Sequence, residues 1–113
     1  MSPLRTGDVV VVEFGSGSQH IQAAVIMSPD TYLVSGPPQH VVVVPCGSPA
    51  VTLPSDVAVM LIGAHGEPEC FAAQAELVRA VKIDCCTSII GNVGPGPVQR
   101  IGAILRMLIA IDP

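Results

Sequence analysis

A run of four valines near the N-terminus, Asp8-Val9-Val10-Val11-Val12-Glu13-Phe14, points most directly to the fold. β-Branched side chains favour extended strands, and Gly15 ends the run, so a first strand is expected over residues 8–14. A second run, Val41-Val42-Val43-Val44-Pro45, is apolar throughout and predicts a strand buried on both faces. Such β signals dominate the first two-thirds of the chain.

Clusters of Gly, Ser, Pro and Asp divide the rest of this region into further short strands. We expect strands at Gln22–Met27, at Val57–Ile62 and at Ser88–Val93, the last with a bulge at Gly91. Residues 31–34 are expected to form a short edge piece, and residues 71–83 either one long strand or two strands with a bend.

The hydrophobic period changes after Gly94-Pro95-Gly96-Pro97. Proline suits the first turn of a helix, and apolar residues then recur at helical spacing through Ile111. The sequence therefore predicts a mainly β fold with a C-terminal α-helix, a small curled antiparallel β-barrel closed by that helix. The length of 113 residues fits a single domain, residues 1–113.

The composition narrows the classes of function. Half of the residues (50%) are hydrophobic, which excludes intrinsic disorder. Charged residues make up only 12%, so we expect an apolar surface that binds a second copy or a protein partner. A net charge of −4 with five Lys and Arg residues argues against a general polyanion-binding surface. The longest helix-like apolar stretch, residues 101–111, is too short to span a membrane, and we expect no membrane association.

The four cysteines and three histidines show no spacing typical of a metal site. Cys46, Cys70, Cys85 and Cys86 contain no Cys-x-x-Cys pair, and a bridge between adjacent cysteines is strained. We expect free thiols, mostly buried, in a reducing cytoplasm, and no metal or cofactor.

Four segments, in order along nearly the whole chain, resemble the MazF/PemK family of bacterial toxins. They are Arg5-Thr6-Gly7-Asp8-Val9-Val10, Ala24-Val25-Ile26-Met27-Ser28-Pro29-Asp30, Val43-Val44-Pro45-Cys46-Gly47-Ser48, and Ala73 to Val81 followed by Ile90-Gly91-Asn92-Val93 and the terminal helix. The resemblance implies a MazF/PemK/CcdB-like barrel and a homodimer in the bacterial cytoplasm. It implies metal-independent, sequence-specific cleavage of single-stranded RNA, and a cognate antitoxin, a short and partly disordered protein that wraps the dimer.

The resemblance also identifies candidate catalytic residues. Metal-free RNA cleavage needs a base, an acid and donors that hold the phosphorane charge. Glu76 matches an acidic position that has been cast as a base, and Arg79 matches an arginine that contacts phosphate. Gln74 precedes Glu76 by two residues, so in a regular strand both would share a face, and Gln74 could orient RNA. The alternatives are a solvated Glu76, and an ion pair of Arg79 with Glu76 or Asp84.

A second set of residues is expected to bind RNA: Gln22, His20, Ser48 and Lys82. Some relatives carry a histidine in the loop that holds His20, although a plain solvent-exposed histidine is the alternative. Ser48 is what remains of a Thr-Ser pair in the family.

Three positions depart from the family pattern. Gln22 stands where the family has its first catalytic arginine, and Gly47 and Ala80 stand where it has threonines. Losing one transition-state donor can cost about 10²–10³ in rate. The alternative is therefore a weak or inactive relative that acts by protein binding, to an antitoxin or to another target such as gyrase, as the related CcdB-type toxins do. A third possibility is an unrelated β-barrel interaction module.

Overall fold

The computed structural model describes residues 4–13, 21–34, 39–48, 53–62 and 66–109. The expected mainly β fold with a C-terminal α-helix is confirmed. The elements are β1 (Asp8–Glu13), β2 (Ile21–Ile26), α1 (Asp30–Val34), β3 (His40–Gly47), β4 (Asp56–Ile62), β5 (Pro68–Gln74), the 3₁₀ turn η2 (Ala75–Leu77), β6 (Arg79–Lys82), the 3₁₀ turn η3 (Ile83–Cys85), β7 (Cys86–Asn92) and α2 (Pro95–Leu108).

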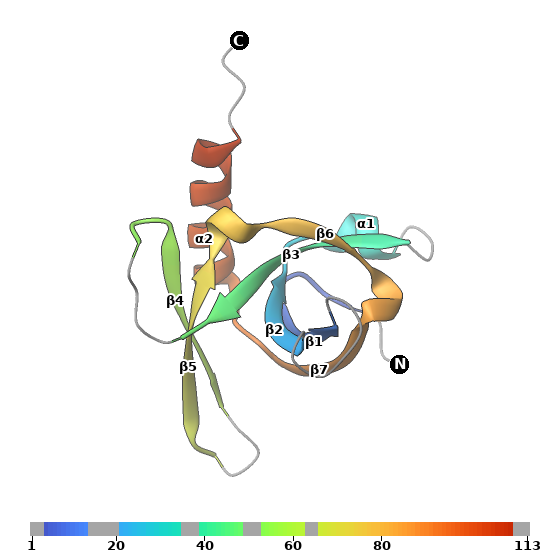
Figure 1. Cartoon of the computed structure of the whole chain (residues 1–113), viewed down its shortest axis with the longest axis horizontal. Coiled ribbons are helices and arrows are strands. Elements are labelled where there is room, and N and C mark those ends of the chain that lie inside the picture. The colour runs from blue at the N-terminus through green and yellow to red at the C-terminus, as the bar shows by residue number, and fades with distance from the viewer. Residues whose placement is uncertain (1–3, 14–20, 35–38, 49–52, 63–65, 110–113) are drawn as a thin grey trace.

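All strand pairs are antiparallel, in the order β4-β5-β3-β2-β1-β7, with β6 added on β3. The long strand β3 joins two parts of the sheet, because residues 40–43 pair with β6 and residues 46–47 pair with β5. Figure 1 shows β1, β2, β3, β6 and β7 curling into a ring, with the β4–β5 pair and α2 beside it. This is the predicted curled barrel.

Two apolar clusters hold the strands together. The inner core lies within the ring and includes Val10, Val12, Ile26 and Val43. The outer core lies between the other face of β1, β2 and β3 and the cover formed by β4, β5 and α2; its members are Val9, Val25, Val44, Cys46, Val57, Val59, Leu61, Ala73 and Ile101. Because both faces of β1 are covered, its valine run needs no polar alternation.

Two local expectations were wrong or incomplete. Residues 31–34 form most of α1 instead of an edge strand, because the carbonyl of Pro29 accepts the N–H groups of Tyr32 and Leu33 and Leu33 is buried. Val42 is 39% exposed, so the β3 run is not buried on both faces along its whole length. Of the two alternatives for residues 71–83, two strands with a bend is confirmed, since η2 interrupts them. The irregularity near Gly91 is confirmed, because Val9 pairs with Gly91 while Val10 pairs with Ile89.

Side chains and N–H groups at the start of β1 connect three strands to α1. The Thr6 N–H and hydroxyl both donate to Asp30 Oδ1, at 2.8 and 3.1 Å. The backbone hydrogen bond from Thr6 lowers the pKa of the Asp30 carboxyl. Gly7 donates its N–H to Ile26 and accepts the N–H of Val93, so it links the ends of β2 and β7.

Gly7 is expected to tolerate no side chain. Its φ of +88° disfavours any L side chain, and a Cβ would lie 3.0 Å from Val98 Cγ2 and 3.1 Å from Asn92 Oδ1. Gly7→Ala should lower the free energy of unfolding by about 1–3 kcal/mol, measured by chemical denaturation. Gly66→Ala is the matched control, because Gly66 has φ +77° with no atom within 4 Å of its Cβ position. Equal losses in the two variants would show that the contact with α2 and β7 contributes nothing.

Within the described ranges, no helix is long and apolar enough to cross a membrane.

Candidate functional site

The carboxyl end of β3 is where two of the candidate side chains meet. Gln22, on β2, donates its Nε2–H to the carbonyl of Cys46 at 3.1 Å. The β2–β3 register pairs Ala24 with Pro45 and therefore brings Gln22 beside the end of β3. Gln22 is half-buried. Its amide is thus held on the backbone, at the position where the family resemblance places an arginine.

Gln74 reaches the same end of β3 from the other side. It is the last residue of β5, and the β3–β5 ladder pairs Cys46 with Ala73 and Gly47 with Ala72. A Cβ at Gly47 would lie 2.9 Å from Gln74 Oε1. The half-buried Gln74 amide therefore packs directly over Gly47. Gln22 and Gln74 enclose one short stretch of backbone, and this juxtaposition was not predicted because it joins three separate segments.

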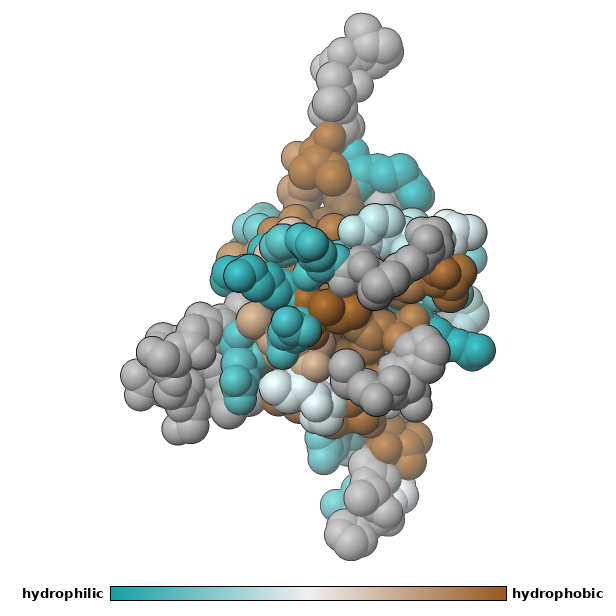
Figure 2. Space-filling model, turned by 90° about the vertical axis from the view of Figure 1, so that its right-hand side faces the viewer, coloured by the Kyte–Doolittle hydropathy of each residue, from teal (hydrophilic) through white to brown (hydrophobic). Residues whose placement is uncertain are grey.

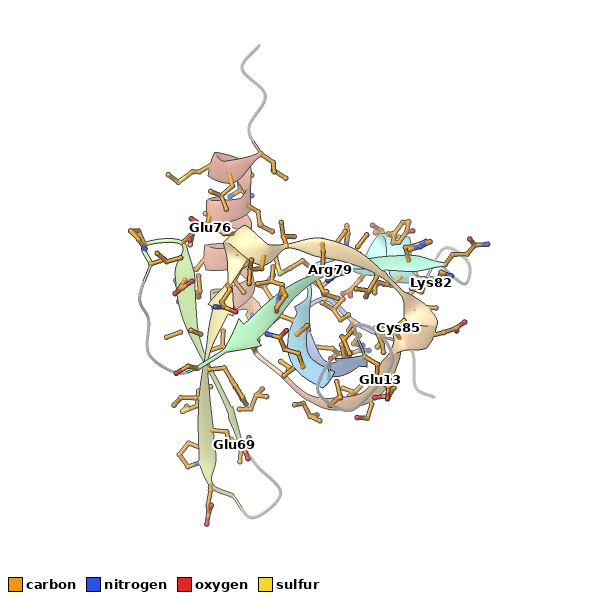
Figure 3. The ribbon with its side chains drawn as sticks, viewed as in Figure 1. Glu13, Glu69, Glu76, Arg79, Lys82 and Cys85 are labelled. Carbon is orange, nitrogen blue, oxygen red and sulfur yellow. The ribbon has the colours of Figure 1, made fainter. Side chains whose placement is uncertain are left out.

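Glu76 does not share a strand face with Gln74, because the segment is not one regular strand. β5 ends at Gln74, and Glu76 lies exposed on η2, which closes with a hydrogen bond from the Val78 N–H to the Ala75 carbonyl at 3.1 Å. Figure 3 shows Glu76, Arg79 and Lys82 spaced along the ribbon from η2 through β6. The expectation that Gln74 and Glu76 share one strand face is therefore wrong.

The β3–β6 register separates the two cations of β6. Arg79 pairs with Val43 and Lys82 pairs with His40. Directly opposed residues of an antiparallel pair share a face, so Arg79 belongs to the inner-core face that also carries Gln22. Lys82 alternates to the opposite face, about 10 Å further along the strand. Both side chains are exposed.

The other two predicted RNA contacts are placed only in part. Ser48 directly follows β3 and is exposed beside Gly47. His20 lies outside the described residues. The structure thus brings together Gln22, Gln74 and Ser48 at the end of β3, with Arg79 on the same sheet face and Lys82 on the opposite one. Glu76 lies on η2, between the strand that ends at Gln74 and the strand that begins at Arg79.

The cysteines do not supply a nucleophile at this site. Burial raises the pKa of the Cys46 thiol to about 12, so the thiolate is not formed near neutral pH. All four cysteines are free, as expected, but Cys70 is exposed and Cys85 only half-buried. The described part of the chain holds no group of three or more His, Cys, Asp or Glu side chains that could bind a metal ion.

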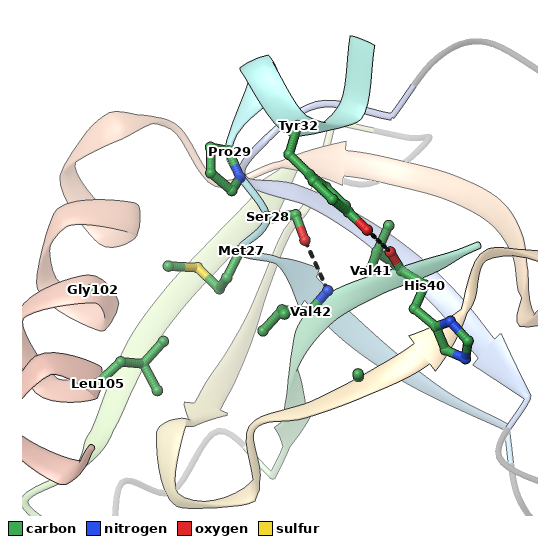
Figure 4. A pocket seen from close by; sticks show the side chains of 10 residues that line it. Met27, Ser28, Pro29, Tyr32, His40, Val41, Val42, Gly102 and Leu105 are labelled. Atoms are coloured by element: carbon green, nitrogen blue, oxygen red, sulfur yellow. Dashed lines mark hydrogen bonds between the residues drawn. The ribbon is translucent and has the colours of Figure 1, made fainter. Parts of the chain in front are cut away.

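A second concave feature, the apolar groove, lies between α1, β3, β6 and α2. Its volume is about 580 Å³, and its walls include Met27, Tyr32, Val42, Ala80 and Leu105. Figure 4 shows the Tyr32 hydroxyl donating to the His40 carbonyl across one end, at 3.2 Å. The sequence does not reveal this groove, because an unbroken valine run predicts that Val42 is buried and no local pattern places Ala80 near α2.

Comparisons with known proteins identify the fold. No protein-family model and no curated protein matches the sequence. Among solved structures, an endoribonuclease in complex with its cognate antitoxin from a mycobacterial species is similar, with TM-score 0.74 and 22% identity over 99% of this chain and 100% of that one. A MazE–MazF structure from Deinococcus radiodurans gives TM-score 0.73 and 18% identity over 99% and 100%. A MazF toxin of Mycobacterium tuberculosis gives 0.71 and 11% over 94% and 99%. The chain therefore has the fold of these proteins, as the resemblance implied.

Proposed function

We propose that this chain is a MazF/PemK-type toxin, a metal-independent endoribonuclease that cleaves single-stranded RNA in a sequence-specific way. The observation that carries the proposal is the agreement in fold over nearly the whole of both chains with a protein solved as an endoribonuclease bound to its antitoxin. The order of the four family-like sequence segments supports it independently.

In the proposed mechanism Arg79 holds the charge that develops on the cleaved phosphate. It lies on the inner-core face of the sheet. A guanidinium there can donate two parallel hydrogen bonds to phosphate oxygens. Glu76, exposed on η2, takes the proton of the attacking 2′-hydroxyl. The 2′-oxygen then bonds to phosphorus to give a 2′,3′-cyclic phosphate, the bond to the 5′-oxygen breaks, and that oxygen takes a proton from water. Gln22 and Gln74 orient the RNA from the end of β3, with Ser48, and Lys82 contacts phosphates further along the strand.

The surface of α2 supports the proposed homodimer and antitoxin. Met107 is 80% exposed and Ile109 66% exposed, and Leu108 lies between them. Figure 2 shows this apolar end of α2 as the brown region below the grey atoms at the top. Together with the apolar groove it offers surface for a second copy and for a short, partly disordered antitoxin in the bacterial cytoplasm.

A cleavage assay tests the proposal. The purified protein is incubated with cellular RNA in EDTA, and cut sites are mapped by primer extension. Cuts that share a short sequence and persist in EDTA are expected. Intact RNA at micromolar enzyme would refute the nuclease.

A second function, toxicity through protein binding, is favoured by one observation. Gln22 is occupied with the Cys46 carbonyl, and Ala80 lines the apolar groove instead of offering a hydroxyl. A chain that has lost catalytic groups can still bind an antitoxin or another target through such a groove. If induced expression of the chain arrests growth while the cellular RNA stays intact, this second function is supported over RNA cleavage.

A further inference from the structure

The contact between Gly47 and Gln74 has an unusual geometry. A Cβ built on Gly47 would lie 2.9 Å from Gln74 Oε1, 3.1 Å from Cδ and 3.3 Å from Nε2. All three heavy atoms of the amide group therefore gather over the one backbone position. The amide occupies the space that a side chain at position 47 would fill.

The β3–β5 ladder fixes the backbone that leads to Gln74. Ala72 and Ala73, which precede Gln74 on β5, are buried and pair with Gly47 and Cys46. This pairing fixes the backbone just before Gln74, and the half-buried Gln74 side chain lies against Gly47. Such support is what precise recognition needs.

The Gln74 amide is also available to a ligand. Within the described ranges it forms no hydrogen bond, whereas the neighbouring Gln22 amide donates to the Cys46 carbonyl. An amide presents a donor and an acceptor side by side. The edge of a nucleobase offers the matching pair, while a phosphate offers acceptors alone. Single-stranded RNA is recognised mostly through such exposed base edges.

We propose that Gln74 is a specificity-determining residue that reads the edge of one unpaired base, and that Gly47 positions it by carrying no side chain. The inference rests on the proposed RNA substrate. Gly47 is then more than the loss of a hydroxyl. Where the resemblance places a threonine, this chain has a glycine, and the Gln74 amide of β5 fills the space beside it. Arg79, on the same sheet face, supplies the phosphate contact that Gln74 does not.

Substitution of Gln74 tests base reading directly. Cut-site preferences are measured by sequencing the products of a randomised single-stranded RNA pool. Gln74→Ala should reduce discrimination at one base position by about 5- to 150-fold, the range for loss of a paired base contact. Gln74→Glu, which keeps the size but replaces the donor by an acceptor, should shift that preference toward bases presenting an amino group. Gln99→Ala, on the exposed face of α2, is the control and should leave all preferences unchanged.

A second set of variants tests the positioning by Gly47. Gly47→Thr should displace the Gln74 amide, lowering both the melting temperature and the base discrimination. In the double variant Gly47→Thr, Gln74→Ala the clash is gone, so its melting temperature should return to that of Gln74→Ala alone. If the double variant instead loses as much stability as the two single variants together, the contact is overturned.

The outcomes separate this inference from the proposed function. If Gln74→Ala cuts RNA with wild-type base preferences, base reading by Gln74 is overturned and the nuclease stands. If the folded wild-type protein neither cuts nor binds the RNA pool, both are overturned. The stability measurements on the Gly47 variants remain informative in either case, because they need no RNA.

Discussion

Replacing Arg79 with alanine should lower the rate of RNA cleavage about 10²- to 10³-fold, which is the usual loss for one donor to transition-state charge. Arg79 is exposed at the start of β6, so its truncation opens no cavity and the fold should persist. The loss should appear in the single-turnover rate constant at saturating enzyme, since the charge that Arg79 stabilises develops only in the transition state. Far-ultraviolet circular dichroism and the melting temperature check the fold.

Two further variants make this result specific. Arg100→Ala removes the same charge from an exposed position on α2 and should change the rate little. Arg79→Lys keeps the charge but loses the planar pair of donors, so its rate should lie between those of wild type and Arg79→Ala. Cleavage by Arg79→Ala at the wild-type rate would remove Arg79 from the mechanism and leave Glu76 without its proposed partner in catalysis.

The fold was predictable because its strongest signals are local. The valines of β1 and β3 favour strands wherever they fall, and Pro95 and Pro97 mark the start of α2. Residues 31–34 were misassigned because two distant interactions favour the helix there. Asp30 accepts hydrogen bonds from Thr6, and Leu33 packs into the inner core. Neither contact can be predicted from the residues around positions 31–34, because both join segments that are distant in the sequence.

The candidate site was predictable only as a set of positions. Family-like segments indicated Gln22, Glu76 and Arg79, but their arrangement depends on strand register. A three-residue turn, η2, removes Glu76 from the strand that carries Gln74. The contact of Gln74 with Gly47 spans 27 positions and depends on the pairing of β3 with β5. A sequence of small residues, Ala72, Ala73 and Gly47, is compatible with such a close approach but does not specify it.

Replacing Ile101 with alanine is the substitution expected to cost the most stability. Ile101 is the fully buried residue of α2 and lies in the outer core beside Val9, Val25 and Val44. Ile104 and Leu105 are only partly buried against the same core. Removing its outer carbons leaves a cavity that β-sheet neighbours cannot close, so the free energy of unfolding should fall by about 2–5 kcal/mol. Chemical denaturation with an unchanged slope against denaturant concentration would measure this loss.

Ile109→Ala is the matched control for this effect. Ile109 directly follows α2 and is 66% exposed, so its truncation should change stability by less than about 0.5 kcal/mol. A loss below about 1 kcal/mol in Ile101→Ala would mean that α2 is not anchored in the outer core. The outer core also supports the back of β2 and β3, which carry Gln22 and Gly47 on their opposite face. Ile101→Ala should therefore retain cleavage well below its melting temperature and lose it together with the fold, whereas Arg79→Ala should lose it at every temperature.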